Sequence, residues 1–140
     1  MNTFESQNTV DGKKDHNIVV LKLIYFWAFI EAGIGGLLHL LHIPLTGFVI
    51  GGFAVVINVL LAKFGGNKAT VFMKALGIVL AVKFLLSPYI PFGAYLAVSF
   101  QGLLAAFLFS LFGLNSLTIF LFAMLVMVES GLQKPLVAFF

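Results

Sequence analysis

The chain has 140 residues, of which 61% are hydrophobic and only 9% are charged, with a mean hydropathy of +1.13. A soluble domain carries roughly 25% charged residues, so this composition excludes a soluble monomeric globule. Two long segments, residues 32–62 and 84–128, contain no Asp, Glu, Lys or Arg. Such segments indicate that much of the chain has lipid as its solvent.

Residue types that are missing exclude further classes of protein. There is no Cys, which excludes disulfides, thiolate metal sites and thiol nucleophiles. All eight cations are Lys, and the net charge is only +3, so the charge indicates membrane orientation rather than binding to nucleic acid. No nucleotide-binding or hydrolase motif occurs. We therefore expect no enzymatic activity and no cofactor.

The first 18 residues are polar and predict a short flexible tail on the cytoplasmic side. The polar lead is too long, and the apolar run after it too extended, for a cleaved signal peptide. Residues 19–140 are predicted to form a single transmembrane helical domain.

Five apolar segments follow the tail, and each is close to the length of about 20 residues that a helix needs to cross a bilayer. Pro and Gly clusters separate them, and Ser116 can cap the last one. The predicted spans are residues 19–41, 47–64, 70–86, 92–112 and 116–131. After them, Pro135 begins either a short lipid-facing end or a sixth helix. The sequence thus predicts an all-α integral membrane protein, a polytopic bundle of five spans.

The lysines are distributed unevenly over the loops. They flank the first span and the second loop, at positions Lys13, Lys14, Lys22, Lys63, Lys68 and Lys74. The first and third loops contain none. By the positive-inside rule, the N-terminus and the second loop are predicted to face the cytoplasm of a bacterial cell, with the chain in the plasma membrane. Lys134 falls on the outer side in this scheme and counts against it.

Glu31 lies at the middle of the first span. An ionised carboxylate there costs several kcal/mol unless it is paired or faces water, so we expect it to point into the bundle. Lys83, near the outer end of the third span, is its natural partner, although a lysine at this depth can also extend toward the interface. Gln101 lies at a similar depth to Glu31 in the fourth span.

Other polar residues gather in the outer half. His39 and His42 are three residues apart and share a helix face, but two histidines do not complete a metal site, so no metal is expected. Each polar residue also has a structural explanation, as an ion pair, an interfacial histidine or a helix–helix hydrogen bond. Their convergence favours a hydrated cavity open to the outside, with Glu31 and Gln101 as its floor. The predicted substrate-binding residues are Glu31, His39, His42, Lys83, Tyr89, Tyr95 and Gln101.

Small residues recur at four-residue steps in the first span, at Ala28, Ala32 and Gly36. Such a stripe leaves a flat groove against which another helix can pack. The partner helix can belong to a second protein or to this chain, and the spacing leaves both alternatives open.

This layout resembles the substrate-binding S component of energy-coupling factor (ECF) transporters. The resemblance rests on residues 28–32, the Ile-Pro-Leu loop of residues 43–45, the Gly-rich segment 47–61 and residues 87–95. It implies capture of a vitamin or similar micronutrient from outside, with a transmembrane coupling subunit and two cytoplasmic ATPases as partners. It also implies that Ala28 and Ala32 dock the coupling subunit. The family usually has six helices, and this chain offers five and the segment 135–140. The members that carry cobalt or nickel have an N-terminal histidine cluster, and His16 alone makes a metal substrate unexpected.

Two other functions remain open. The single carboxylate Glu31 in a short membrane protein is similar to the small multidrug resistance family, in which one acid exchanges protons for a cationic drug. The polar tail, Lys83 and the extra span argue against that function. A third alternative is an accessory subunit that packs against partners and transports nothing.

Overall fold

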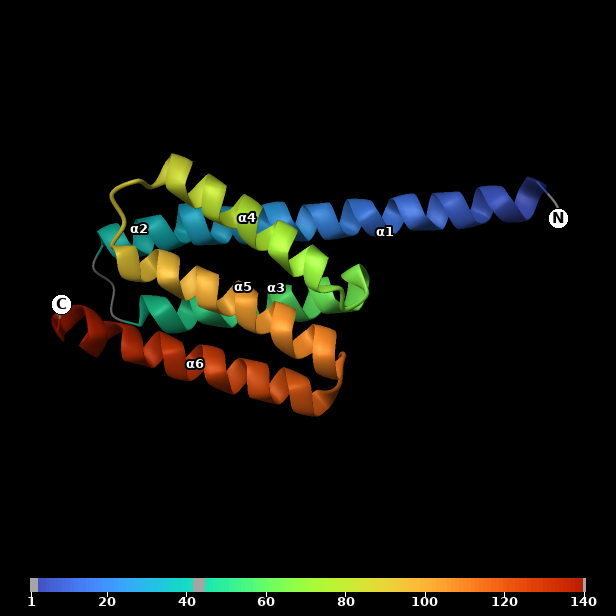
Figure 1. The fold of residues 1–140 in the computed structure, drawn as a ribbon. Coiled ribbons are helices and arrows are strands. Elements are labelled where there is room, and N and C mark those ends of the chain that lie inside the picture. Colours follow the sequence, from blue (N-terminus) through green and yellow to red (C-terminus); the bar gives the residue numbers. More distant parts are fainter. Residues whose placement is uncertain (1–2, 42–44, 140) are drawn as a thin grey trace.

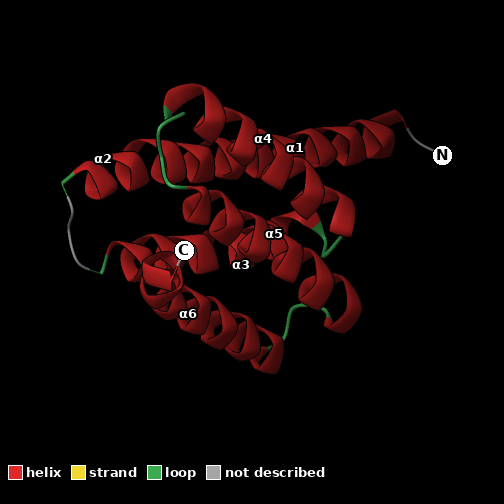
Figure 2. Cartoon of the chain, turned by 60° about the vertical axis from the view of Figure 1, so that its left-hand side comes forward, coloured by secondary structure: helices red, strands yellow, loops and turns green. Residues whose placement is uncertain are grey.

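The computed structural model describes residues 3–41 and 45–139, with the side chains of residues 11–41 and 45–132. Within these ranges all regular elements are helices (Figures 1 and 2). They are α1 (Thr3–Phe29), the π-helix η1 (Ile30–Ile34), α2 (Gly35–Leu40), α3 (Thr46–Gly65), α4 (Ala69–Leu86), α5 (Phe92–Phe112) and α6 (Ser116–Phe139). α1, η1 and α2 follow one another without a break.

Four helical segments of the described chain are long and apolar enough to cross a membrane. They are Asp11–Leu40, Thr46–Gly65, Ala69–Leu86 and Phe92–Phe112, and a shorter apolar segment, Ser116–Leu132, lies within α6. Large hydrophobic side chains such as Phe29, Leu85 and Phe107 are exposed on the outside of the bundle, where lipid would cover them. The protein is an all-α helical bundle of the membrane type.

Two predicted helix boundaries differ from the structure. The first helix begins at Thr3 rather than near residue 19, so the polar segment that we expected to be flexible is helical. Lengthening an existing helix needs no new nucleus, and a polar segment can therefore stay helical beyond the apolar part. At the other end, α6 continues through Pro135 to Phe139. The described chain thus has no separate sixth helix beginning after residue 131.

Local capping explains where the helices end. Gly66 and Gly113 follow α3 and α5 with φ of +74° and +71°, which glycine adopts without steric cost. The cap of α6 is Asn115 rather than Ser116, because the Asn115 Oδ1 atom accepts hydrogen bonds from the Thr118 N–H and hydroxyl at 3.0 and 2.7 Å. An Asn at this position satisfies a donor that the first helical turn would otherwise leave free.

The helices pack in a closed ring. α1 contacts α3 and α4, α3 contacts α6, and α5 contacts both α6 and α4. The chain runs back and forth along the bundle, so the α2–α3 connection, the α4–α5 connection and the last turns of α6 lie at one end (Figure 1). The N-terminal turns of α1 project from the opposite end.

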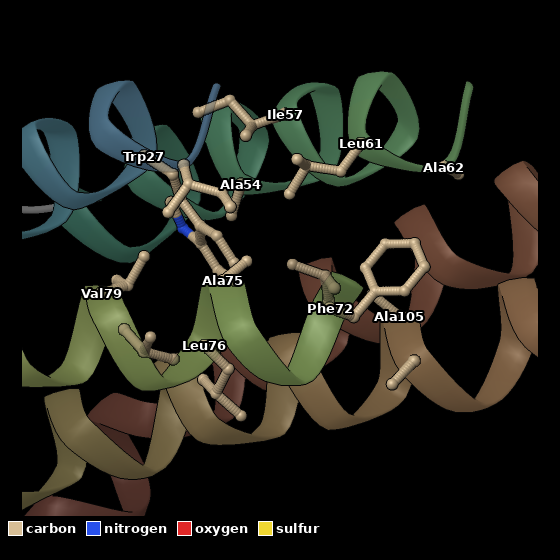
Figure 3. Packing of buried hydrophobic residues seen from close by; sticks show 14 of the residues in the cluster. Trp27, Ala54, Ile57, Leu61, Ala62, Phe72, Ala75, Leu76, Val79 and Ala105 are labelled. Atoms are coloured by element: carbon tan, nitrogen blue, oxygen red, sulfur yellow. The ribbon is translucent and has the colours of Figure 1, made fainter. Parts of the chain in front are cut away.

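The hydrophobic core fills the half of the bundle on the N-terminal side. Figure 3 shows the Trp27 side chain between α3 and α4, close to Ala54 and Ala75. Further along, Phe109 stacks on Phe72 at 5.8 Å between ring centroids and meets Phe122 edge-on at 5.2 Å. Asn58 on α3 is a polar residue buried in this region, where its Nδ2 atom donates a hydrogen bond to the carbonyl of Ala54 at 2.8 Å.

Candidate functional site

A buried ion pair lies at the centre of the bundle. The Nζ atom of Lys83 on α4 donates a hydrogen bond to Oε2 of Glu31 on η1 at 2.7 Å, and both side chains are only 3% exposed. Trp27 lies one turn before Glu31 and is fully buried, so its indole separates the pair from the N-terminal half. Lys83 therefore points inward to the carboxylate and does not extend to the interface.

Glu31 lies in a π-helical segment. The Gly35 N–H donates a hydrogen bond to the carbonyl of Ile30, five residues earlier. In an α-helix the acceptor would be four residues earlier, so this turn contains one extra residue. Single π turns of this kind occur frequently at functional sites. The carbonyl of Ala32 in the same turn accepts a hydrogen bond from the Ser87 hydroxyl at 3.2 Å. The first helix is thus tied to the end of α4 at two points, through Glu31 and through Ala32.

A large cavity, the outer cavity, opens at the end of the bundle that carries the α2–α3 and α4–α5 connections. Its volume is about 980 Å³, and it is lined by η1, α2, residues 45–48, residues 86–91, the first turn of α5 and Ser130–Gly131. Most of these residues are Leu, Ile, Pro or Gly. At its rim Leu45 has a left-handed backbone with φ of +72°, which is uncommon and strained for a residue other than glycine.

A much smaller cavity, the inner chamber, lies next to the outer cavity. Its volume is about 20 Å³, enough for one water-sized group. Polar side chains line it, among them Glu31, Lys83 and Gln101. The two cavities have five lining residues in common: His39, Thr46, Gly47, Ala94 and Ser130.

The structure brings together most of the side chains that the sequence singles out. Glu31, Lys83 and Gln101 surround the inner chamber, His39 lines both cavities, and Tyr89 lines the outer cavity and is 99% exposed. Glu31 and Gln101 are thus at the deep end, as expected for a floor. Their binding of a substrate stays a prediction.

One predicted site residue, Tyr95, does not line either cavity in the described structure. The Tyr95 hydroxyl donates a hydrogen bond to the carbonyl of Ser87 at 3.0 Å, so this side chain fixes the α4–α5 connection. His42 lies outside the described residues. No three His, Asp or Glu side chains within the described ranges are grouped so that they could hold a metal ion.

The stripe of small residues packs within the chain itself. Ala28 and Ala32 are 2% and 3% exposed, inside the bundle. A Cβ atom added at Gly36 would lie 3.0 Å from the Ser87 hydroxyl oxygen. In this structure the stripe therefore lets the end of α4 approach the first helix, and docking of a second protein on it stays a prediction.

Four features of the site were not predicted from the sequence. Thr46 and Ser87 lie at helix ends, where a hydroxyl is usually a cap or a turn residue, whereas Ser130 lies inside α6. The signal for Ser130 was its place in the same apolar segment as Glu129. The π turn was indicated only by the unusual density of glycine after Glu31.

Comparisons with models of protein families, with curated proteins and with solved structures find no match to this chain.

Proposed function

We propose that this protein is a substrate-capture subunit embedded in the membrane, of the kind that serves ECF-type uptake transporters. It holds a vitamin or similar micronutrient in the outer cavity and relies on partner ATPase subunits for energy. The observation that carries the proposal is the pair of cavities. An apolar cavity of about 980 Å³ opens at one end of the bundle and has a buried polar chamber at its deep end.

The size and lining of the outer cavity support this proposal. Ligand pockets usually measure roughly 300–1,000 Å³ and are mostly apolar, with a few polar groups that orient the ligand. Here the polar groups are held in the inner chamber by rigid helices, and the rim is built from connections between helices. Intramembrane ionisable residues such as Glu31 and Lys83 are costly and usually serve a function.

The ion pair argues against the alternative of a proton-coupled drug exporter. A carboxylate that exchanges a proton for a cationic drug must be free to release both, whereas Glu31 is bonded to Lys83 at 2.7 Å. In that alternative Glu31→Gln abolishes pH-driven efflux from cells that express this chain alone. In our proposal, cells that express either the original chain or the Glu31→Gln variant show no pH-driven efflux.

The direct test is native mass spectrometry of protein that has been gently extracted from membranes. We expect a small molecule to remain bound. Tyr89→Ala should lower its occupancy, because Tyr89 lines the outer cavity. Tyr25→Ala is the matched control, an exposed tyrosine on α1 that lines neither cavity. If no small molecule binds to the original sequence, the chain is better described as an accessory subunit.

A second test concerns the partners. Cells that express the chain together with a transmembrane coupling subunit and two ATPases should accumulate the bound molecule. Cells that express the chain alone should bind it and not accumulate it. Accumulation by the chain alone would contradict the proposed dependence on ATPases.

A further inference from the structure

The lining of the inner chamber indicates the chemistry of a ligand as well as its size. Three side-chain oxygens on residues that line it are buried and have no hydrogen-bond partner among the described residues: Glu31 Oε1, Gln101 Oε1 and Ser130 Oγ. Buried polar atoms in folded proteins are hydrogen-bonded with few exceptions. Three such atoms around a space of about 20 Å³ point to a single small group that bonds to them.

The chemistry of these oxygens defines that group. The Glu31 Oε1 atom of an ionised carboxylate only accepts hydrogen bonds, and so does the amide oxygen of Gln101. The group in the chamber must therefore supply N–H or O–H donors. A carboxylate or phosphate would bring more acceptors to face these oxygens, and a fully methylated group would bring no donor.

The charge balance of the chamber indicates that the group is uncharged. Among the residues that line the chamber, Glu31 and Lys83 neutralise each other at 2.7 Å, and a further charge would lack a counter-ion within that lining. The Lys83 ammonium carries three N–H groups and gives one to Glu31, so it can also donate to a carbonyl oxygen of the ligand.

We propose that the ligand is an uncharged molecule with an apolar or aromatic body and a compact N–H donor group, such as a primary amide. The body lies in the outer cavity. The NH2 group of the amide, which is about as large as one water molecule, enters the chamber past His39, Thr46 and Ala94, which line both cavities, and donates to Glu31 Oε1 and Gln101 Oε1. This inference rests on the proposed function, because it names the class of substrate for the same site.

Three probes of similar size test the inference: benzamide, N,N-dimethylbenzamide and benzoate. Each is added at millimolar concentration to the purified full chain in lipid nanodiscs, and binding is measured by calorimetry at neutral pH. We expect benzamide to bind at least about tenfold more tightly than the other two, since a site with buried acceptors rejects analogues that lack the donor.

Variants link the preference to the chamber. Gln101→Leu removes one acceptor, and we expect it to reduce the preference for benzamide severalfold. Gln101→Met is closer to glutamine in shape and gives the same test if Gln101→Leu does not fold. Ser99→Ala, on the same helix and outside the lining of both cavities, is the control and should leave the preference unchanged.

The inference is wrong if benzoate or N,N-dimethylbenzamide binds as tightly as benzamide, or if benzamide does not bind. These measurements need no coupling subunit, so they are independent of the transport experiments. If the protein binds benzamide selectively but shows no ATPase-dependent uptake, the proposed function is wrong, and the inference that the ligand donates hydrogen bonds is retained. Uptake of an anionic substrate would refute the donor chemistry and keep the proposed function.

Discussion

Glu31 and Lys83 lie 52 positions apart in the chain and form a single neutral unit inside the bundle. The pair is tolerated there because the attraction between the two charges offsets part of the cost of removing both from water. Each residue alone would be a buried charge in an environment that offers few other partners. The two side chains should therefore depend on each other far more strongly than exposed charges on the same helices do.

At the residue scale we predict a large loss of stability for Lys83→Met. The variant leaves the Glu31 carboxylate buried without its counter-ion, which costs about 3–5 kcal/mol. Unfolding can be followed in mixed micelles by the fluorescence of Trp27, the single tryptophan of the chain. Lys74→Met, at an exposed position of the same helix, should change stability little.

The double variant Glu31→Gln with Lys83→Met sharpens this prediction. Without either charge, most of the lost stability should return. A double variant as unstable as Lys83→Met alone would show that the lysine acts through packing and not through the ion pair.

At the scale of elements, glycines determine how closely the helices approach. A Cβ atom at Gly51 on α3 would lie 2.6 Å from the Ser130 hydroxyl oxygen on α6. This distance is too short for a real contact, so Gly51 is needed where the two helices close the inner chamber. At Gly77 an added Cβ would meet nothing within 4 Å.

We therefore predict that a glycine-to-alanine substitution has opposite effects on stability at these two positions. Gly51→Ala should destabilise the protein by about 1–3 kcal/mol, as overpacking does, and Ser130→Ala should relieve much of that loss. Gly77→Ala should stabilise the protein by up to about 1 kcal/mol, because alanine favours the helix. Equal thermal unfolding midpoints for the two alanine variants would contradict the α3–α6 packing.

The approach of the first helix to the end of α4 gives another prediction. A Cβ atom at Gly36 would lie 4.0 Å from the Cβ atom of Ser87, within the range of about 3.5–4.5 Å that a disulfide requires. Since the chain has no Cys, the double variant Gly36→Cys with Ser87→Cys should form one defined cross-link. The measurement is protection of both thiols from a maleimide until a reductant is added.

Two controls accompany the cross-link. Gly77→Cys with Ser87→Cys should stay reactive in oxidising buffer. Deletion of Gly33, inside the π turn, should prevent the cross-link between positions 36 and 87, because removing one residue rotates the following helix by roughly 100°. A cross-link that persists after the deletion would mean that the π turn does not determine the position of α2.

At the scale of the whole molecule, the two ends of the bundle differ in charge. The α3–α4 connection, beside which Lys63 and Lys68 lie, is at the end from which α1 projects (Figure 1). The outer cavity opens at the opposite end, which carries the α2–α3 and α4–α5 connections. The positive-inside rule predicts that the lysine end lies in the cytoplasm, and in that orientation the cavity would face the outside. We predict that Tyr89→Cys reacts with an impermeant maleimide in intact cells and that Lys68→Cys reacts only after permeabilisation. The reverse pattern would invert the orientation and contradict uptake from outside.

The sequence was sufficient for most of this arrangement and insufficient for its details. Apolar segments bounded by Pro and Gly locate α3, α4 and α5 to within one residue, because lipid permits few alternatives to a helix. The cost of a charge in lipid similarly predicts that Glu31 and Lys83 point inward. The helicity of residues 3–18 and the π turn depend on small differences in backbone energy. The hydropathy pattern therefore predicts neither of these two features.

The length of the first helix has a mechanical consequence. Residues 3–40 are helical throughout, with the π turn at residues 30–34, and at 1.5 Å per residue this helix is about 55 Å long. A bilayer with its headgroups is about 40–45 Å thick. The helix therefore extends into water, and because α1 is a regular α-helix from Thr3 to Phe29, a rotation at Glu31 would be carried to its polar end. A fluorophore attached at position 13, on the polar part of α1, would therefore report on changes at the buried Glu31 from the aqueous phase.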